Sequence, residues 1–163
     1  MSPQYPGSDL KLQLDAKQLS PQKNVVRIFY DELWNKADTT VIPSIIHEDF
    51  TFRGSLGPDL KGREEFASYV RWVTSTLSSY TCDVFELIEQ DNKVAAKLCF
   101  HGFQEKPMFG CPPTGKHVWW YATPIFTFES GKIKELWIIG DVYGLINRLK
   151  SKDTDIEFDP STH

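Results

Sequence analysis

The chain has 163 residues, a length typical of a single domain. Hydrophobic residues make up 40% and charged residues 25%, a globular composition that excludes disordered and collagen-like classes. The formal net charge is −4, so no basic surface for nucleic acid is expected. The longest stretch without a charged residue, 117–128, is too short to span a membrane.

The cysteines and the N-terminus indicate the cellular setting. Cys82, Cys99 and Cys111 are odd in number and lack metal-binding spacing, which argues against a disulfide framework and favours a reducing compartment. The first residues lack the apolar core of a signal peptide, so a cytoplasmic location is expected. Because the sequence contains no metal-ligand motif and no phosphate-binding glycine loop, we expect neither a metal nor an organic cofactor.

Three segments are predicted along the chain. Residues 1–19 form an N-terminal arm, for which disorder is one option, and residues 151–163 form an acidic tail. The folded domain spans residues 20–150.

The first half of the domain is predicted to be helical. Ser20-Pro21 is a good helix start, and apolar residues follow at helical spacing as far as Trp34. Asp38 can cap a short second helix, which contains Pro43. A short strand over 49–53 and a turn-rich loop then lead to a third helix with its apolar face over 66–77.

The second half is predicted to be extended. Two strand pairs, 80–89 with 93–104 and 117–128 with 132–141, meet at short turns, and a last helix covers about 142–150. Helices followed by a long antiparallel sheet indicate an α+β fold.

The register of the second pair can be predicted from its turn. A two-residue loop at Ser130-Gly131 places Glu129 opposite Lys132, and counting back places Trp120 opposite Asp141. The same face then carries Trp137 and Ile139, so the carboxyl of Asp141 is expected to be buried. A slip of one residue would reverse the faces.

Asp141 is the most informative candidate residue. A carboxyl buried among apolar side chains has a raised pKa and is suited to act as an acid or a base. The alternative is that Asp141 caps the following helix, and the two roles are compatible.

The opposite face of the hairpin is also apolar. It is predicted to carry Trp119, Tyr121, Ile125 and Ile138, too many large side chains to leave in water. We therefore expect a homodimer or homotetramer.

Two further polar residues have open interpretations. His101 lies in a predicted strand and is interpreted either as a partly buried strand histidine or as a catalytic group. Arg53 is either a cation directed at the mouth of the sheet or a solvated turn residue. A serine triad, a kinase and a dinucleotide enzyme are disfavoured because their motifs are absent.

Four segments, in chain order, carry a resemblance to a known family. They are Phe50-Thr51-Phe52-Arg53-Gly54-Ser55-Leu56-Gly57, Gly62-Arg63-Glu64-Glu65-Phe66, Pro112-Pro113-Thr114-Gly115-Lys116, and Gly131 through Trp137 to Asp141. Over residues 20–150 the chain resembles the SnoaL-like polyketide cyclases. The resemblance implies the cone-shaped α+β fold shared with ketosteroid isomerase, scytalone dehydratase and nuclear transport factor 2, in which a curved antiparallel sheet packs against N-terminal helices.

The resemblance also implies an activity. Asp141 matches the acid/base of that family, while Gln104 and Arg53 stand where members often carry histidines. The implied function is a cofactor-independent cyclase or isomerase of a small hydrophobic carbonyl compound, in which Asp141 removes a proton and Arg53, Gln104 or His101 stabilises the enolate. The expected substrate contacts are Trp120, Trp137, Phe52, Tyr69, Phe109 and His117. The alternatives are a non-catalytic module that binds a small molecule or a protein, and an epoxide hydrolase or dehydratase.

Overall fold

The computed structural model describes residues 4–151, so all of the predicted acidic tail except Ser151 lies outside the described residues. The first helix, α1 (Pro21–Ile28), begins where the sequence predicts, because the Ser20 hydroxyl accepts a hydrogen bond from the Lys23 amide and Pro21 occupies the first turn. The helix continues as a π-helical turn, Phe29–Trp34, whose four largest apolar side chains are all buried.

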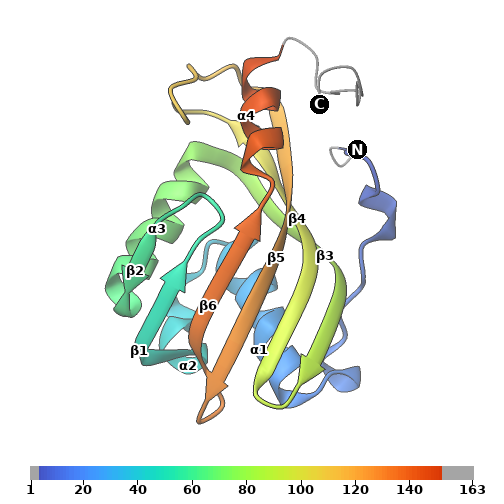
Figure 1. The fold of residues 1–163 in the computed structure, drawn as a ribbon, viewed down its shortest axis with the longest axis vertical. Coiled ribbons are helices and arrows are strands. Elements are labelled where there is room, and N and C mark those ends of the chain that lie inside the picture. The colour runs from blue at the N-terminus through green and yellow to red at the C-terminus, as the bar shows by residue number, and fades with distance from the viewer. Residues whose placement is uncertain (1–3, 152–163) are drawn as a thin grey trace.

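Three further helices follow along the chain. A 3₁₀ turn at Thr39–Val41 leads into α2 (Ile42–Ile45). The longest helix, α3 (Gly62–Thr76), buries one face against the sheet, and α4 (Val142–Lys150) lies beyond the end of the last strand (Figure 1).

Six strands form one sheet. They are β1 (Ile46–Arg53), β2 (Asp59–Lys61), β3 (Leu77–Gln90), β4 (Lys93–Gln104), β5 (His117–Glu129) and β6 (Lys132–Gly140). Their order is β2-β1-β6-β5-β4-β3, and all neighbours are antiparallel except β1 and β6, which are parallel. The fold is therefore α+β as predicted, with a mixed, mostly antiparallel sheet in place of a purely antiparallel one.

The sheet separates a large core from an outer face. Helices α1 and α2 lie behind the sheet in Figure 1, and α3 covers the same side. Aromatic rings fill the space between the layers, where Phe29 stacks on Phe66 at a centroid distance of 5.8 Å and meets Phe126 edge-on at 5.3 Å.

The predicted register of the β5–β6 hairpin is correct at the turn and wrong beyond it. Glu129 pairs with Lys132 and Phe128 with Ile133, but Thr127 then pairs with Glu135 because Lys134 is an extra residue on β6. This bulge shifts every later pair by one residue, so that Ala122 faces Gly140.

The bulge decides which side chains of β6 point inward. Leu136 and Ile138 are buried in the core, whereas Trp137 is 42% exposed and Ile139 is 48% exposed on the outer face. The predicted register placed Trp137 and Ile139 on the same face as Trp120, and Leu136 and Ile138 on the other face. The reason is that strict alternation would have buried Glu135, and the extra residue avoids that cost.

The N-terminal arm lies against the outer face. Residues 4–19 contain two short 3₁₀ turns, Ser8–Leu10 and Ala16–Gln18, and run beside β3 (Figure 1). Within this segment only Tyr5 is buried, at 4% exposed. None of the helices within residues 4–151 is long and apolar enough to cross a membrane.

Candidate functional site

An aromatic cavity lies between the helices and the inner face of the sheet. Its walls come from the π-helical turn, the β1–β2 loop, α3 and five of the strands. The lining residues are Tyr30, Trp34, Phe52, Ser55, Leu56, Tyr69, Val73, Tyr80, Phe100, Trp120 and Ile138. The cavity volume is about 20 Å³, which is room for one water molecule and not for a ring system.

The cavity wall offers hydrogen-bond donors but no charged group. Trp120 Nε1 donates to Ser55 Oγ at 3.1 Å. The Tyr30 hydroxyl is buried and has no hydrogen-bond partner among the described residues. Burial raises the pKa of Tyr30 and of Tyr80 well above the ordinary tyrosine value, so both phenols keep their protons.

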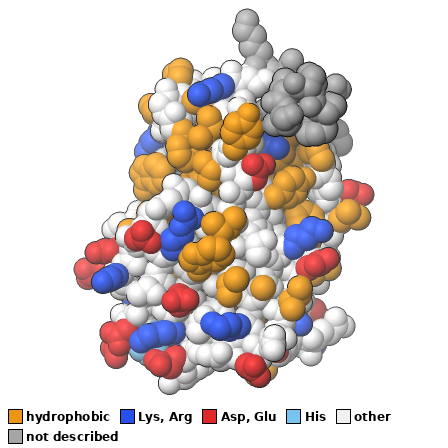
Figure 2. Space-filling model, viewed as in Figure 1, with side chains coloured by type: hydrophobic (Ala, Val, Ile, Leu, Met, Phe, Trp, Pro, Cys, Tyr) orange, Lys and Arg blue, Asp and Glu red, His pale blue; other side chains and the backbone are white. Residues whose placement is uncertain are grey.

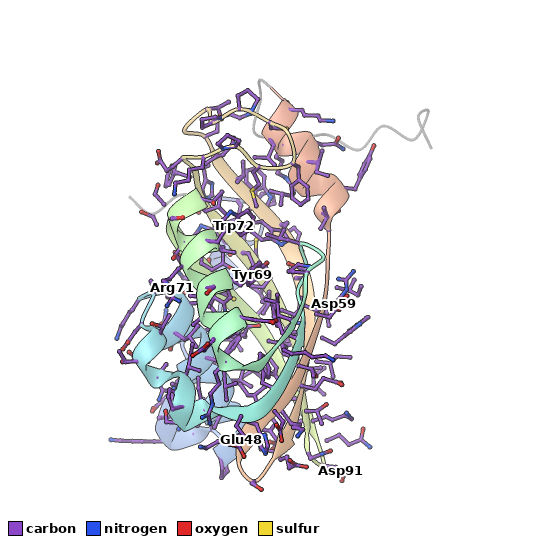
Figure 3. All side chains as sticks on the ribbon, turned by 90° about the vertical axis from the view of Figure 1, so that its left-hand side faces the viewer. Glu48, Asp59, Tyr69, Arg71, Trp72 and Asp91 are labelled. Atoms are coloured by element: carbon purple, nitrogen blue, oxygen red, sulfur yellow. The ribbon has the colours of Figure 1, made fainter. Side chains whose placement is uncertain are left out.

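The cavity meets the surface beside α3. Of the lining residues only Leu56 and Tyr69 are partly exposed, which places the mouth between the β1–β2 loop and α3. Trp72 lies one turn further along α3 and stacks on Tyr69 with a centroid distance of 6.0 Å (Figure 3). Leu56 and Tyr69, the latter stacked on Trp72, therefore border the mouth.

Asp141 does not lie in the cavity, and its expected burial is wrong. The residue is exposed, and its Oδ1 accepts a hydrogen bond from the Gly144 amide at 2.9 Å, which makes it the N-cap of α4. The physical reason is the bulge at Lys134, which pairs Gly140 rather than Ile139 with Ala122. Gly140 itself packs against Ser55 in the cavity wall, so Asp141 follows that wall by one residue.

The three expected partners of Asp141 are not brought together with it. Arg53 is half-buried and donates from Nη1 to the carbonyl oxygens of Gly54 and Ile138, at 2.9 and 3.0 Å. Gln104 is fully buried, and its Nε2 donates to the Lys106 and Cys111 carbonyls at 3.2 and 3.0 Å. It therefore holds the β4–β5 loop in place.

The expected substrate contacts divide into two groups. Phe52, Tyr69 and Trp120 line the cavity. Trp137 and Phe109 do not line it. The bulge turns Trp137 to the outer face, and Phe109 lies in the β4–β5 loop. Each of the two side chains is 42% exposed. The sixth contact, His117, lies on the outer face of the sheet together with His101.

These two histidines belong to a polar chain on the outer face. Tyr5 donates its hydroxyl to Asp83 Oδ2 at 2.6 Å, and the same oxygen lies 3.0 Å from His101 Nε2. The other nitrogen of that ring, Nδ1, lies 3.0 Å from His117 Nε2. His101 is therefore a buried strand histidine, which was the non-catalytic one of its two interpretations.

Sequence reasoning missed most of the cavity wall, and of this chain it named His101 and His117 but neither Tyr5 nor Asp83. Tyr30 and Trp34 were assigned only to the apolar face of a helix, and their shared spacing gave no indication that a cavity lay beside them. Asp83 was not singled out, because Tyr5 is 78 residues away in the sequence and nothing local marks the pair.

Comparison with known proteins agrees with this fold. The sequence pattern of the family described as SnoaL-like polyketide cyclase matches residues 24–149. Aklanonic acid methyl ester cyclase DnrD from Streptomyces peucetius is 28% identical over 120 residues, which are 72% of this chain and 82% of that protein.

Solved structures show the same architecture. TsrD from Streptomyces laurentii superposes with a TM-score of 0.72 at 22% identity, covering 85% of this chain and 98% of TsrD. A SnoaL-like polyketide cyclase from Agrobacterium tumefaciens strain C58 gives a TM-score of 0.68 at 16% identity, covering 82% of this chain and all (100%) of that one. With the family pattern extending over most of the chain, this protein belongs to the SnoaL-like polyketide cyclase family.

Proposed function

We propose that this protein is a cofactor-independent cyclase or isomerase that acts on a small hydrophobic carbonyl compound of the polyketide type. The observation that carries the proposal is the cavity, whose wall combines aromatic rings with buried hydroxyl and indole donors. Family membership and the cyclase relatives support the same reaction class.

The proposed ring closure is an intramolecular aldol addition. A base removes a proton next to one carbonyl, and the resulting enolate carbon attacks a second carbonyl carbon of the same molecule. The new alkoxide then takes up a proton, so that substrate and product are isomers and no oxidant or reductant is needed. The donors of the cavity wall stabilise the negative oxygen during these steps.

Within this proposal Tyr30 is a donor and Asp141 is the base. The hydroxyl of Tyr30 keeps its proton and has no other partner among the described residues, so it is available to a carbonyl oxygen. For Asp141 to act, its carboxylate has to leave the Gly144 amide and turn toward the cavity wall, where the preceding residue, Gly140, packs against Ser55.

The proposal requires the cavity to widen. At about 20 Å³ the closed cavity does not hold a polyketide, so substrate binding has to move side chains at the mouth, where Leu56 and Tyr69 are already partly exposed. Such closure over a bound substrate also excludes water from the enolate.

The experiment uses aklanonic acid methyl ester, the compound that appears in the names of the cyclase relatives. Substrate and product are separated by chromatography with mass detection. Wild-type protein is expected to form a product of unchanged mass. Asp141→Asn keeps the helix cap and removes the base, so turnover should fall on the order of hundredfold or more. Asp38→Asn, which changes another aspartate cap, partly exposed, is the matched control and should keep wild-type turnover. Full activity in Asp141→Asn would exclude Asp141 as the base.

One observation favours a second candidate function, a non-catalytic binding module. None of the described residues that line the cavity is an aspartate, a glutamate or a histidine. A module of this kind would bind the ester without converting it, and Asp141→Asn would bind it equally well. Binding measured by quenching of tryptophan fluorescence, alongside the turnover assay, separates the two functions.

A further inference from the structure

The N-terminal arm is attached to the outer face of the sheet mainly at one place. Tyr5 packs against His101 at a ring distance of 5.1 Å and meets Phe85 edge-on at 6.4 Å. Together with Cys99 and Trp119 it forms a small apolar cluster separate from the main core. Further along, the arm is mostly exposed and is joined to β3 by the Leu12 amide, which donates to the Val84 carbonyl at 2.7 Å.

The anchor of the arm is the buried carboxylate of Asp83. This side chain is 8% exposed and accepts hydrogen bonds from Tyr5 and His101, while Lys11 Nζ lies 3.7 Å from its other oxygen. The two hydrogen bonds and the ion pair with Lys11 all weaken when Asp83 is protonated, because the carboxyl then loses its negative charge and one of its acceptor sites.

The two histidines behind Asp83 can hold only a limited number of protons. With Asp83 ionised, His101 donates from Nε2, so its Nδ1 either accepts from or donates to His117 Nε2. The chain survives one extra proton on the pair. When both rings are fully protonated, the two facing nitrogens are both donors, and the bond between them is lost.

The other ionisable groups around the chain do not replace this bond. From α4, Arg148 stacks over the Trp119 ring at 4.6 Å and donates to the Trp119 carbonyl at 2.8 Å. On the sheet side Cys99 is buried and burial raises the pKa of its thiol to about 12, so it stays neutral. Tyr121, from β5, donates its hydroxyl to the Pro6 carbonyl.

We infer that the N-terminal arm is a strap that the Tyr5–Asp83–His101–His117 chain holds on the outer face of the sheet, and that protonation of this chain releases it. Release uncovers the apolar cluster of Phe85, Cys99 and Trp119 and frees the Leu12 contact on the edge strand β3. The strap is independent of the proposed ring closure, because it lies on the face of the sheet opposite the cavity.

The direction of the pH effect follows from the two shifted groups. Burial, and next the charge of His101, lower the pKa of His117 from 6.5 to about 4. Burial alone would raise the pKa of Asp83, but the hydrogen bonds from His101 and Tyr5 and the nearby positive charges hold it below its ordinary value. Tyr5 and Lys11 of the strap are among the groups that hold the pKa of Asp83 down, and the pKa of His117 is lowered in the structure in which the strap is closed. The closed form is therefore favoured above pH 6.5 and loses stability as the pH falls toward about 4.

The test is amide hydrogen exchange, expressed as protection factors so that the intrinsic pH dependence of exchange is removed. Between pH 7 and pH 4 the protection of the Leu12 amide should fall by up to about a hundredfold. The Phe128 amide, which donates to the Asn92 carbonyl away from the strap, should keep its protection and so report that the domain is folded. At pH 7, Tyr5→Phe should lower Leu12 protection roughly tenfold or more, because it removes one charge-assisted hydrogen bond.

The decisive variant is His117→Gln, whose amide can still donate to His101 but does not titrate. It should flatten the Leu12 profile between pH 6.5 and 4. His47→Gln, which changes a histidine paired with Glu129 at 3.0 Å elsewhere on the sheet, is the matched control and should behave as wild type. Unchanged Leu12 protection at pH 4, simultaneous loss at Leu12 and Phe128, or a wild-type profile in His117→Gln would each overturn the strap.

Discussion

At the scale of single residues, burial decides which polar groups are available for chemistry. Tyr30 has a hydroxyl that lies in the core without a partner among the described residues, which costs stability unless a ligand supplies the partner. Asp141 is the opposite case, since water and the Gly144 amide already satisfy its carboxylate. The cavity therefore contains the unsatisfied group, while the residue that sequence reasoning ranked first is satisfied at the surface.

Replacing Tyr30 with phenylalanine tests this assignment. Because the variant removes a buried hydroxyl that has no partner among the described residues, the free energy of unfolding should rise by about 1 kcal/mol. Urea denaturation followed by circular dichroism measures the change. Tyr143→Phe, at a site that is 71% exposed, is the control and should leave stability unchanged. A lower stability in Tyr30→Phe would mean that the hydroxyl already has a partner.

At the scale of elements, local sequence rules predict most of the fold. Ser20-Pro21 starts α1, and Asp91-Asn92 and Ser130-Gly131 each join two strands, all within a few residues of their predicted places. The bulge at Lys134 was missed because the prediction assumed strict alternation. The spacing of Ile133, Leu136 and Ile138 contained the signal, since two core residues three apart on a strand require one extra residue between them.

The close contact between β6 and the β1–β2 loop can be tested at Gly140. A Cβ at this position would lie 2.7 Å from Ser55 Cβ and 3.2 Å from Trp120 Cδ1, both of them buried. Gly140→Ala should therefore destabilise the protein by about 1–3 kcal/mol in urea denaturation. In a Ser55→Gly background the same substitution should cost clearly less. An equal cost in both backgrounds would show that Ser55 is not the obstacle.

At the scale of the whole molecule, contacts between segments that are distant in the sequence are the part of the fold that local patterns do not predict. The arm meets β3 across 78 residues, and β1 pairs in parallel with β6 although the two strands are far apart in the chain. Both contacts depend on how complete layers pack, and no local pattern encodes them. The cavity is a consequence of the same packing, and of its lining only Phe52, Tyr69 and Trp120 were among the expected substrate contacts.

The outer face of the sheet leads to a prediction about assembly. Trp137, Ile139 and Tyr121 are 42%, 48% and 37% exposed, and hydrophobic side chains gather over this face in Figure 2. A face with this much exposed aromatic and aliphatic surface is unfavourable in water, so we propose that two copies of the chain cover it by pairing their sheets. Light scattering should then give twice the chain mass of 18.7 kDa.

The matched pair of variants for this dimer is Trp137→Lys and Trp72→Lys. The two tryptophans have similar exposure, 42% and 48%, but Trp137 lies on the outer face of β6 whereas Trp72 lies on α3, in the layer on the other side of the sheet (Figure 3). A lysine at 137 would place two ammonium groups in the paired faces, where their desolvation and mutual repulsion oppose association. Trp137→Lys should therefore be monomeric at concentrations at which wild type and Trp72→Lys are dimeric. A wild-type mass of 18.7 kDa at all concentrations would contradict the dimer, and a dimer that survives Trp137→Lys would contradict this face as its interface.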